Sequence, residues 1–149
     1  RDAQESRGLG DVYKRQAACR RFMKDNTLLI TADTIVWLDG KVYGKPRDIA
    51  DAKAMLQALS GKTHTVITGV TLTSLQKQIS FAVSTEVTFA TLGDDEIDYY
   101  VEKYRPLDKA GAYGVQEWIG YIGVTGLKGS YYNVMGLPIQ RLYTELKKF

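Results

Sequence analysis

Two long strand-like segments separated by only a short turn constrain the fold of this chain most strongly. Residues 64–74 alternate in character, with apolar or threonine side chains at every second position from Val66 to Leu72. This period of two is typical of a strand with one buried face. Residues 79–91 are again strand-like, and the joining segment 75–78 has room only for a turn. The sequence therefore predicts an antiparallel pair of long strands.

Further strands are predicted on both sides of this pair. Residues 27–38 are apolar and β-branched enough to form a buried strand, and Asp39-Gly40 is a hairpin-type turn into a short strand at 41–43. The glycine-rich segment 111–136 is expected to hold two more short strands, around Tyr121–Val124 and Tyr131–Val134.

Helices are predicted between and after these strands. The clearest is 48–60, where Asp48 can act as N-cap and Gly61 supplies the stop. Asp94-Asp95 are expected to cap a second helix, and Pro138 opens the last one. A short helix is also expected at 17–26. The fold class is α/β, with a mixed twisted sheet, flanking helices, no repeats and no internal linker.

Composition excludes several kinds of function. The 149 residues suit one domain, and their net charge of +3, with mixed signs along the chain, does not favour a nucleic-acid partner. One cysteine, Cys19, allows no internal disulfide, and one histidine, His64, excludes two-histidine zinc motifs. No apolar run reaches the roughly 20 residues of a membrane span, and the N-terminus lacks the apolar segment that is typical of a signal peptide. We expect a cytoplasmic protein without a membrane partner.

The first sixteen residues, RDAQESRGLGDVYKRQ, differ from everything that follows. They are polar, contain two closely spaced glycines, and show no sustained period of 2 or 3.6. We interpret residues 1–16 as a disordered lead or as sequence foreign to the domain, which then comprises residues 17–149.

Asp33 is the first candidate for a functional residue. It follows an apolar run, and a carboxylate there must be solvated, hydrogen-bonded or metal-bound, since burying it unpaired would be costly. Lys45, between glycine and proline a dozen residues later, could approach the same anionic substrate. The alternative is that Asp33 caps a local turn.

Gln116 is the second candidate, at the end of DKAGAYGVQ. Small residues flank Tyr113, and Gly114 allows the backbone close to a ligand. An amide that offers both a donor and an acceptor can read the edge of a base. The alternative is a glycine-rich loop with an exposed glutamine.

Five motifs together carry a family resemblance. In order they are ADTIV, GKP, LSGKTHTVITGV, DKAGAYGVQ and GSYYNVMGLP. Over roughly residues 27–149 they resemble the Maf family of nucleotide pyrophosphatases. The resemblance implies an elongated α/β fold with a cleft between two lobes. It also implies hydrolysis of nucleoside triphosphates to the monophosphate and pyrophosphate with a divalent cation, Mg²⁺ or Mn²⁺.

The resemblance also assigns roles to individual residues. Asp33, the aspartate of ADT, matches the acidic catalytic residue, and Thr34 matches a position tied to substrate selection. By its chemistry, Asp33 could hold the divalent cation or act as the base toward water, and both alternatives stay open. Lys45 of GKP would contact the phosphates, and Gln116 is linked to base specificity. GKP combined with AYGVQ looks like the branch that acts on dTTP and UTP, rather than the sister branch for modified guanine nucleotides.

The front of the chain departs from the family pattern. Members begin with a strand and a loop of the type L-A-S-x-S-P-R-R, followed by a catalytic glutamate and a lysine, and residues 1–26 contain none of these. We interpret this as a missing N-terminal part, with residues 1–16 a remnant of sequence assembly. Activity of this particular polypeptide is then uncertain.

Other functions stay open from the sequence alone. The chain could be a pyrophosphatase for non-standard purine nucleotides, a nucleotide-binding regulator without turnover, or, third, an RNA-binding domain. The sequence also leaves open whether the protein is a monomer or a homodimer.

Overall fold

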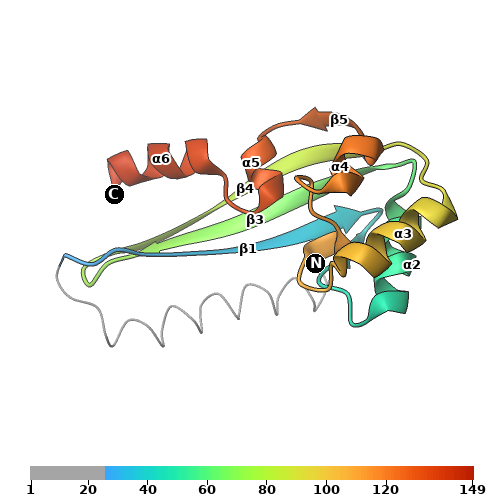
Figure 1. Cartoon of the computed structure of the whole chain (residues 1–149). Coiled ribbons are helices and arrows are strands. Elements are labelled where there is room, and N and C mark those ends of the chain that lie inside the picture. Colours follow the sequence, from blue (N-terminus) through green and yellow to red (C-terminus); the bar gives the residue numbers. More distant parts are fainter. Residues whose placement is uncertain (1–25) are drawn as a thin grey trace.

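A single antiparallel sheet organises the part of the chain that the computed structural model describes, residues 26–149 (Figure 1). Its strands, in the order β2-β1-β3-β4-β5 across the sheet, are β1 (Leu29–Leu38), β2 (Lys41–Tyr43), β3 (Thr63–Thr73), β4 (Gln78–Phe89) and β5 (Val124–Lys128). Every pairing between neighbouring strands is antiparallel. β1, β3 and β4 are long, which gives the molecule an elongated shape.

The predicted hairpins are confirmed. β3 and β4 stay in register from Thr63 opposite Thr88 to Thr73 opposite Gln78, and the Ser74 N–H donates to the Lys77 carbonyl across the turn at 2.8 Å. β1 and β2 are joined by Asp39 and Gly40, whose φ angles are 50° and 80°. Two positive φ angles match the twist that a two-residue hairpin requires.

The helices gather mainly at one end of the sheet (Figure 1). They are α2 (Ile49–Leu59), α3 (Asp94–Tyr104), the short 3₁₀ turn η1 (Ala110–Ala112), α4 (Trp118–Gly123), α5 (Tyr131–Met135) and α6 (Ile139–Lys148). α6 lies alone over the opposite end of the long strands. No helix within residues 26–149 is long and apolar enough to cross a lipid bilayer.

Two of the three predicted helix starts are confirmed, and one needs correction. Asp48 caps α2 by accepting from the Asp51 N–H at 2.8 Å, and Pro138 directly precedes α6. At α3, however, Gly93 is the N-cap, and its N–H donates to the Glu96 carboxylate at 2.7 Å. Asp94 and Asp95 lie inside the first turn, where their negative charges interact favourably with the positive end of the helix dipole.

The two short strands predicted in the glycine-rich segment are wrong. Most of Tyr121–Val124 belongs to α4, and β5 only begins at Val124. Tyr131–Val134 belongs to α5, where the Ser130 hydroxyl accepts from the Asn133 N–H at 3.1 Å and caps the helix. Aromatic and β-branched residues have only a weak preference for strands. In this segment the helix cap and the burial of Asn133 outweigh that preference.

Two hydrophobic clusters form the core. The larger one joins β1, β3 and β4 to α2, α3 and α4, and is centred on side chains such as Leu56, Leu59 and Phe89. The smaller one, under α6, has Val70, Leu72 and Leu142 as its buried members. The clusters occupy different stretches of the same long strands, which is consistent with a fold of two lobes.

Residues 1–25 lie outside the described part of the chain. The predicted helix at 17–26, Cys19 and the boundary between the lead 1–16 and the domain 17–149 therefore stay predictions.

Candidate active site

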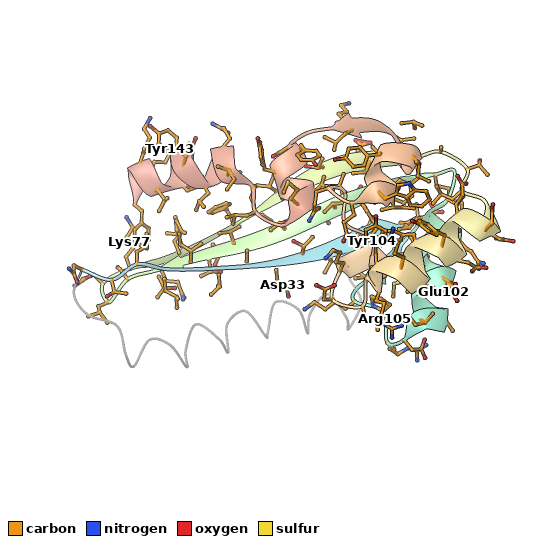
Figure 2. The ribbon with its side chains drawn as sticks, viewed as in Figure 1. Asp33, Lys77, Glu102, Tyr104, Arg105 and Tyr143 are labelled. Carbon is orange, nitrogen blue, oxygen red and sulfur yellow. The ribbon has the colours of Figure 1, made fainter. Side chains whose placement is uncertain are left out.

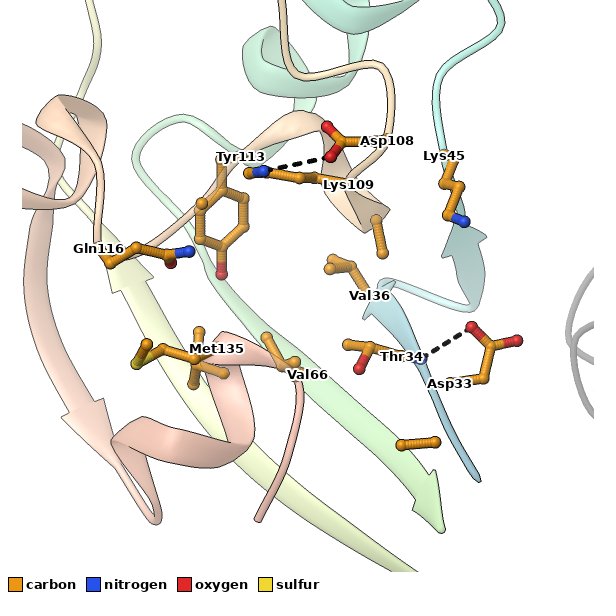
Figure 3. A pocket seen from close by; sticks show the side chains of 15 residues that line it. Asp33, Thr34, Val36, Lys45, Val66, Asp108, Lys109, Tyr113, Gln116 and Met135 are labelled. Atoms are coloured by element: carbon orange, nitrogen blue, oxygen red, sulfur yellow. Dashed lines mark hydrogen bonds and ion pairs between the residues drawn. The ribbon is translucent and has the colours of Figure 1, made fainter. Parts of the chain in front are cut away.

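A pocket of about 300 Å³ lies beside β1, against side chains of the large core cluster (Figure 3). All four residues singled out from the sequence, Asp33, Thr34, Lys45 and Gln116, line it. They come from three segments that are far apart in the sequence: β1, the connection from β2 to α2, and the loop after η1. The fold therefore brings the candidates together, and their chemical roles stay predictions.

Asp33 lies within β1 rather than at its end. It is paired with Gly69 of β3, so the residue directly opposite carries no side chain. One oxygen of the half-buried carboxylate accepts the Thr34 N–H at 3.0 Å. The alternative that Asp33 caps a local turn is wrong, because its backbone is part of a regular ladder. The carboxylate lies on the sheet face opposite α6 (Figure 2).

Thr34 points to the other face and is tied into the fold. Its hydroxyl shares a hydrogen bond of 2.8 Å with the Thr68 hydroxyl, which in turn bonds the Asn133 carbonyl at 3.2 Å. Asn133 is fully buried, and its amide donates to the carbonyls of Val66 and Val83. This polar chain fixes α5, and with it the pocket wall at 134–136, to the strands.

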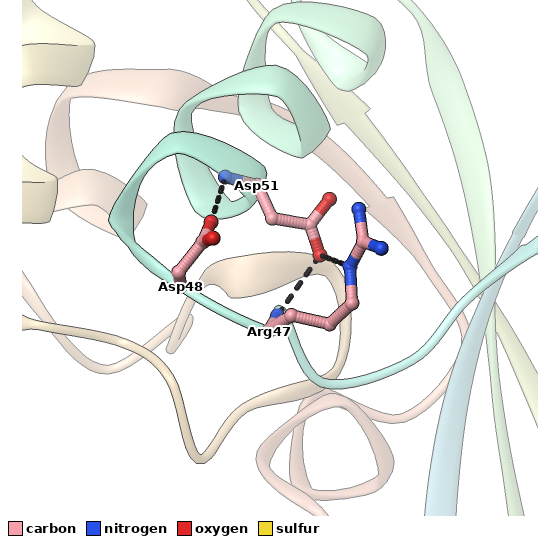
Figure 4. A network of polar contacts seen from close by, with 3 residues as sticks. All are labelled: Arg47, Asp48 and Asp51. Carbon is pink, nitrogen blue, oxygen red and sulfur yellow. Dashed lines mark hydrogen bonds and ion pairs between the residues drawn. The ribbon is translucent and has the colours of Figure 1, made fainter.

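Lys45 lies in the connection from β2 to α2, which is fixed on both sides of the lysine. The Gly44 carbonyl accepts the Gly111 N–H at 3.1 Å, and Pro46 is buried. The next residue, Arg47, donates its N–H to Asp51 at 2.9 Å beside the Asp48 cap (Figure 4). Lys45 itself is exposed, and no carboxylate among residues 26–149 forms an ion pair with it. Its ammonium is therefore available to an anionic ligand.

The loop from η1 to α4 forms the opposite wall. Gly111 has φ of 69°, and a Cβ there would lie 2.8 Å from the Val36 side chain, so this backbone approaches β1 as only glycine can. The Tyr100 hydroxyl accepts the Gly114 N–H at 3.1 Å and donates to Glu117. These contacts hold the loop that presents Tyr113 and Gln116 to the pocket.

Three further side chains with polar groups line the pocket and were not predicted as site residues. Asp108 and Lys109, 3.5 Å apart, and the buried Tyr113 also line it. All three belong to the motif DKAGAYGVQ, so their proximity to Gln116 in the sequence was the available signal. Tyr113 forms a 2.6 Å hydrogen bond to His64, a contact that sequence spacing does not reveal.

The described residues do not form a metal site on their own. Within residues 26–149, no three His, Cys, Asp or Glu side chains lie close enough together to hold an ion. Asp33 can supply one oxygen ligand to an ion that takes its other ligands from elsewhere.

Comparison with known proteins places the chain in a family. A family model described as Maf-like protein matches residues 11–149. The chain belongs to the Maf family. The match includes residues 11–16, which the sequence analysis assigned to the lead.

Curated Maf relatives are similar over most of the chain. One from Phocaeicola vulgatus is 65% identical over 135 residues, covering 91% of this chain and 70% of the relative. Another, from Bacteroides thetaiotaomicron, is 63% identical over 96% of this chain and 71% of the relative. A third, from Flavobacterium psychrophilum, is 52% identical over 81% of this chain and 62% of its own length. All three are named dTTP/UTP pyrophosphatase.

Proposed function

We propose that this Maf protein is a nucleoside triphosphate pyrophosphatase that hydrolyses dTTP and UTP to the monophosphate and pyrophosphate. The observation that carries the proposal is the convergence of Asp33, Thr34, Lys45 and Gln116 on one pocket. Relatives at 52–65% identity bear the name of this activity. A pocket with a carboxylate, a lysine and an amide has the groups that such a substrate needs.

Lys45 is proposed to bind the triphosphate. The attack of water on a phosphate needs charge neutralisation on several oxygens and an oriented nucleophile. The ammonium of Lys45, which forms no ion pair with residues 26–149, provides fixed positive charge and charge-assisted hydrogen bonds to phosphate oxygens. Lys109, already beside Asp108 at 3.5 Å, is partly neutralised and contributes less.

Asp33 is proposed to act at the reacting phosphate, as a base toward water or as a ligand of a divalent cation. Its second oxygen has no hydrogen-bond partner among the described residues. Mg²⁺ and Mn²⁺ bind through one or two carboxylates together with substrate phosphates and water, so a lone Asp33 fits an ion shared with the substrate. Such an ion would neutralise phosphate charge.

Gln116 and Thr34 are proposed to select the base and sugar. Gln116 is exposed on the loop wall, where its amide can donate and accept at the edge of a base. Thr34, held by Thr68, lines the same pocket from β1.

The test is pyrophosphate release from a panel of nucleotides with Mg²⁺ and with a chelator. UTP and dTTP should be hydrolysed faster than ITP and GTP, and the chelator should abolish turnover. Faster ITP turnover would favour the non-standard purine activity, whereas UTP binding without release would favour a regulator.

Gln116→Glu tests the selectivity within the same assay. An acceptor-only carboxylate cannot replace the donor of the amide, so the ratio of UTP to GTP turnover should fall. Gln76→Glu, the same change at an exposed site in the β3–β4 turn, is the matched control. An unchanged ratio in Gln116→Glu would make Gln116 an ordinary loop residue.

The cellular location and the oligomeric state of the protein are also open to test. Because nucleoside triphosphates are cytoplasmic metabolites, we place the enzyme in the cytoplasm, which fractionation of cells would test. Light scattering on the purified chain would decide between a monomer and the homodimer.

A further inference from the structure

The only histidine of the chain lies directly behind the pocket wall. His64 of β3 and Tyr113 are both buried, and the His64 Nε2 and the Tyr113 hydroxyl oxygen are 2.6 Å apart. Phe89 packs edge-on against both rings, at centroid distances of 5.0 and 4.9 Å. The three rings fix the position of the tyrosine, whose hydroxyl end points toward Val66 and Met135 of the pocket (Figure 3).

The other ring nitrogen of His64 decides which group donates in this hydrogen bond. Nδ1 is buried and has no hydrogen-bond partner among residues 26–149. If Tyr113 donated to Nε2, the neutral ring would carry its proton on Nδ1, and a buried N–H would be left without an acceptor. Such orphaned donors are rare, whereas an unpaired acceptor is more readily tolerated. The favoured arrangement has Nε2–H donating to the tyrosine oxygen.

Both groups keep these protonation states near neutral pH. Burial lowers the pKa of His64 to about 4, so the imidazole is neutral and carries one proton. Burial also raises the pKa of Tyr113, so the phenol keeps its hydrogen. With Nε2–H as donor, the tyrosine hydrogen needs an acceptor, and no residue among 26–149 supplies one.

We propose that Tyr113 determines base specificity by donating its hydroxyl hydrogen into the pocket, to an exocyclic oxygen of the pyrimidine, with His64 as the positioning residue. This proposal rests on the proposed function. Uracil and thymine present two carbonyl oxygens flanking an N–H, a pattern that one hydroxyl donor and one amide can satisfy together. Gln116 lies beside Tyr113 on the same wall (Figure 3). Cytosine replaces one of those oxygens by an amino group, which cannot accept.

The first experiment reads the histidine proton directly. Because the chain has a single histidine, a two-bond ¹H–¹⁵N correlation spectrum of the ¹⁵N-labelled protein at pH 7 shows one imidazole. The proposal predicts a protonated Nε2 and an unprotonated Nδ1. The opposite tautomer would overturn it, because Tyr113 would then donate its hydroxyl hydrogen to His64 and not to the base. This measurement needs no turnover and no variant.

The second experiment tests the contact with the base by binding of UMP, which carries the base and is not hydrolysed. Tyr113→Phe should weaken UMP binding about threefold to tenfold, the usual range for one neutral hydrogen bond. Replacing the accepting oxygen by sulfur, in 2-thio-UMP or 4-thio-UMP, should weaken binding to the wild type. One of the two analogues should then lose nothing further in Tyr113→Phe, because the contact is already absent.

The control is Tyr100→Phe, which removes another buried tyrosine hydroxyl that contacts the same loop. Its effect on UMP binding should be independent of sulfur at either position. Additive losses in Tyr113→Phe for both analogues would overturn the proposal even if UTP is hydrolysed. Lack of UTP hydrolysis by a wild type that shows the predicted tautomer and coupling would instead count against the proposed function.

Discussion

The two ends of the sheet are built on cores of very different size. Within residues 26–149, the end that carries α2, α3 and α4 buries sixteen hydrophobic residues in one cluster, whereas the end under α6 buries three. The pocket takes Val36 and Val66 from the large cluster and Ala32 from the margin of the small one. The comparison teaches that stability resides mainly at one end, while Asp33 lies on the stretch of β1 between Ala32, beside the small cluster, and Val36 of the large one.

The effect of a substitution on stability should therefore depend on where in the fold it lies. Changes in the large core should lower the free energy of unfolding strongly, changes in the small core less, and changes at the pocket polar groups hardly at all. The predictions below follow this order, from the largest expected effect on stability to the smallest.

Leu56→Ala should have the largest effect. Leu56 of α2 is completely buried in the large cluster. Loss of its side chain and the cavity left behind should cost about 3–5 kcal/mol of unfolding free energy, measured by urea denaturation. Leu75→Ala, at an exposed position in the β3–β4 turn, is the control and should cost far less. A loss below about 1 kcal/mol in Leu56→Ala would contradict the conclusion that stability resides mainly in the large cluster.

His64 should make the large core sensitive to acid. Its pKa is lowered by burial to about 4, from 6.5. Below pH 6.5 the unfolded chain binds a proton that the folded chain does not, so stability contributed by the neutral ring is present above pH 6.5 and lost as the pH falls toward 4. The loss should reach about 3 kcal/mol.

The measurement is the unfolding free energy of wild type and His64→Gln between pH 7 and pH 4. Carboxylates titrate in both proteins, so their difference isolates the histidine. The advantage of the wild type should shrink on acidification. A difference that stays constant with pH would show that His64 is not held neutral.

Leu142→Ala tests the small core. Leu142 is the buried residue of α6 and packs with Val70 and Leu72. Few neighbours surround it, so the site can partly collapse, and we expect a loss of about 2 kcal/mol, at the low end for this substitution. Hydrogen exchange should rise in α6 but not in α2. Equal increases in both helices would show that the two cores unfold as one unit.

The sequence predicted the elements whose pattern is local and regular. The alternation from Val66 to Leu72 and the Asp48 cap each specify an element without help from distant residues, and both are confirmed. α5 was predicted as a strand because the buried Asn133 amide that anchors it bonds Thr85 and the β3 and β4 carbonyls, which are distant in sequence. α4 was missed because Gly120 disfavours helices.

The reason for that glycine is a close backbone contact with Val115, five residues earlier in the chain. A Cβ at position 120 would collide with the backbone carbonyl of Val115, so close packing of the turn requires glycine in spite of its low helix propensity. The candidate site shows the same division. Motifs indicated Asp33, Thr34, Lys45 and Gln116, but the partnership of Tyr113 with His64 depends on packing between β3 and the loop.

Asp33→Asn should have the smallest effect on stability and a large effect on turnover. The change is nearly isosteric, and the carboxylate makes a single hydrogen bond, to the Thr34 N–H, among the described residues. An amide oxygen can accept the same bond, so the unfolding free energy should change by less than about 0.5 kcal/mol. Asp39→Asn, the same change in the exposed turn after β1, should alter neither stability nor turnover.

The most direct test of the account is therefore pyrophosphate release from UTP by Asp33→Asn, measured with Mg²⁺ beside the wild type and Asp39→Asn at equal concentration. Removal of a general base or of the charge that binds the cation should lower the rate by about 10²–10⁴-fold, while urea denaturation stays cooperative with an unchanged midpoint. A variant that keeps more than about a tenth of the wild-type rate would contradict the assignment of Asp33 and of this pocket as the active site.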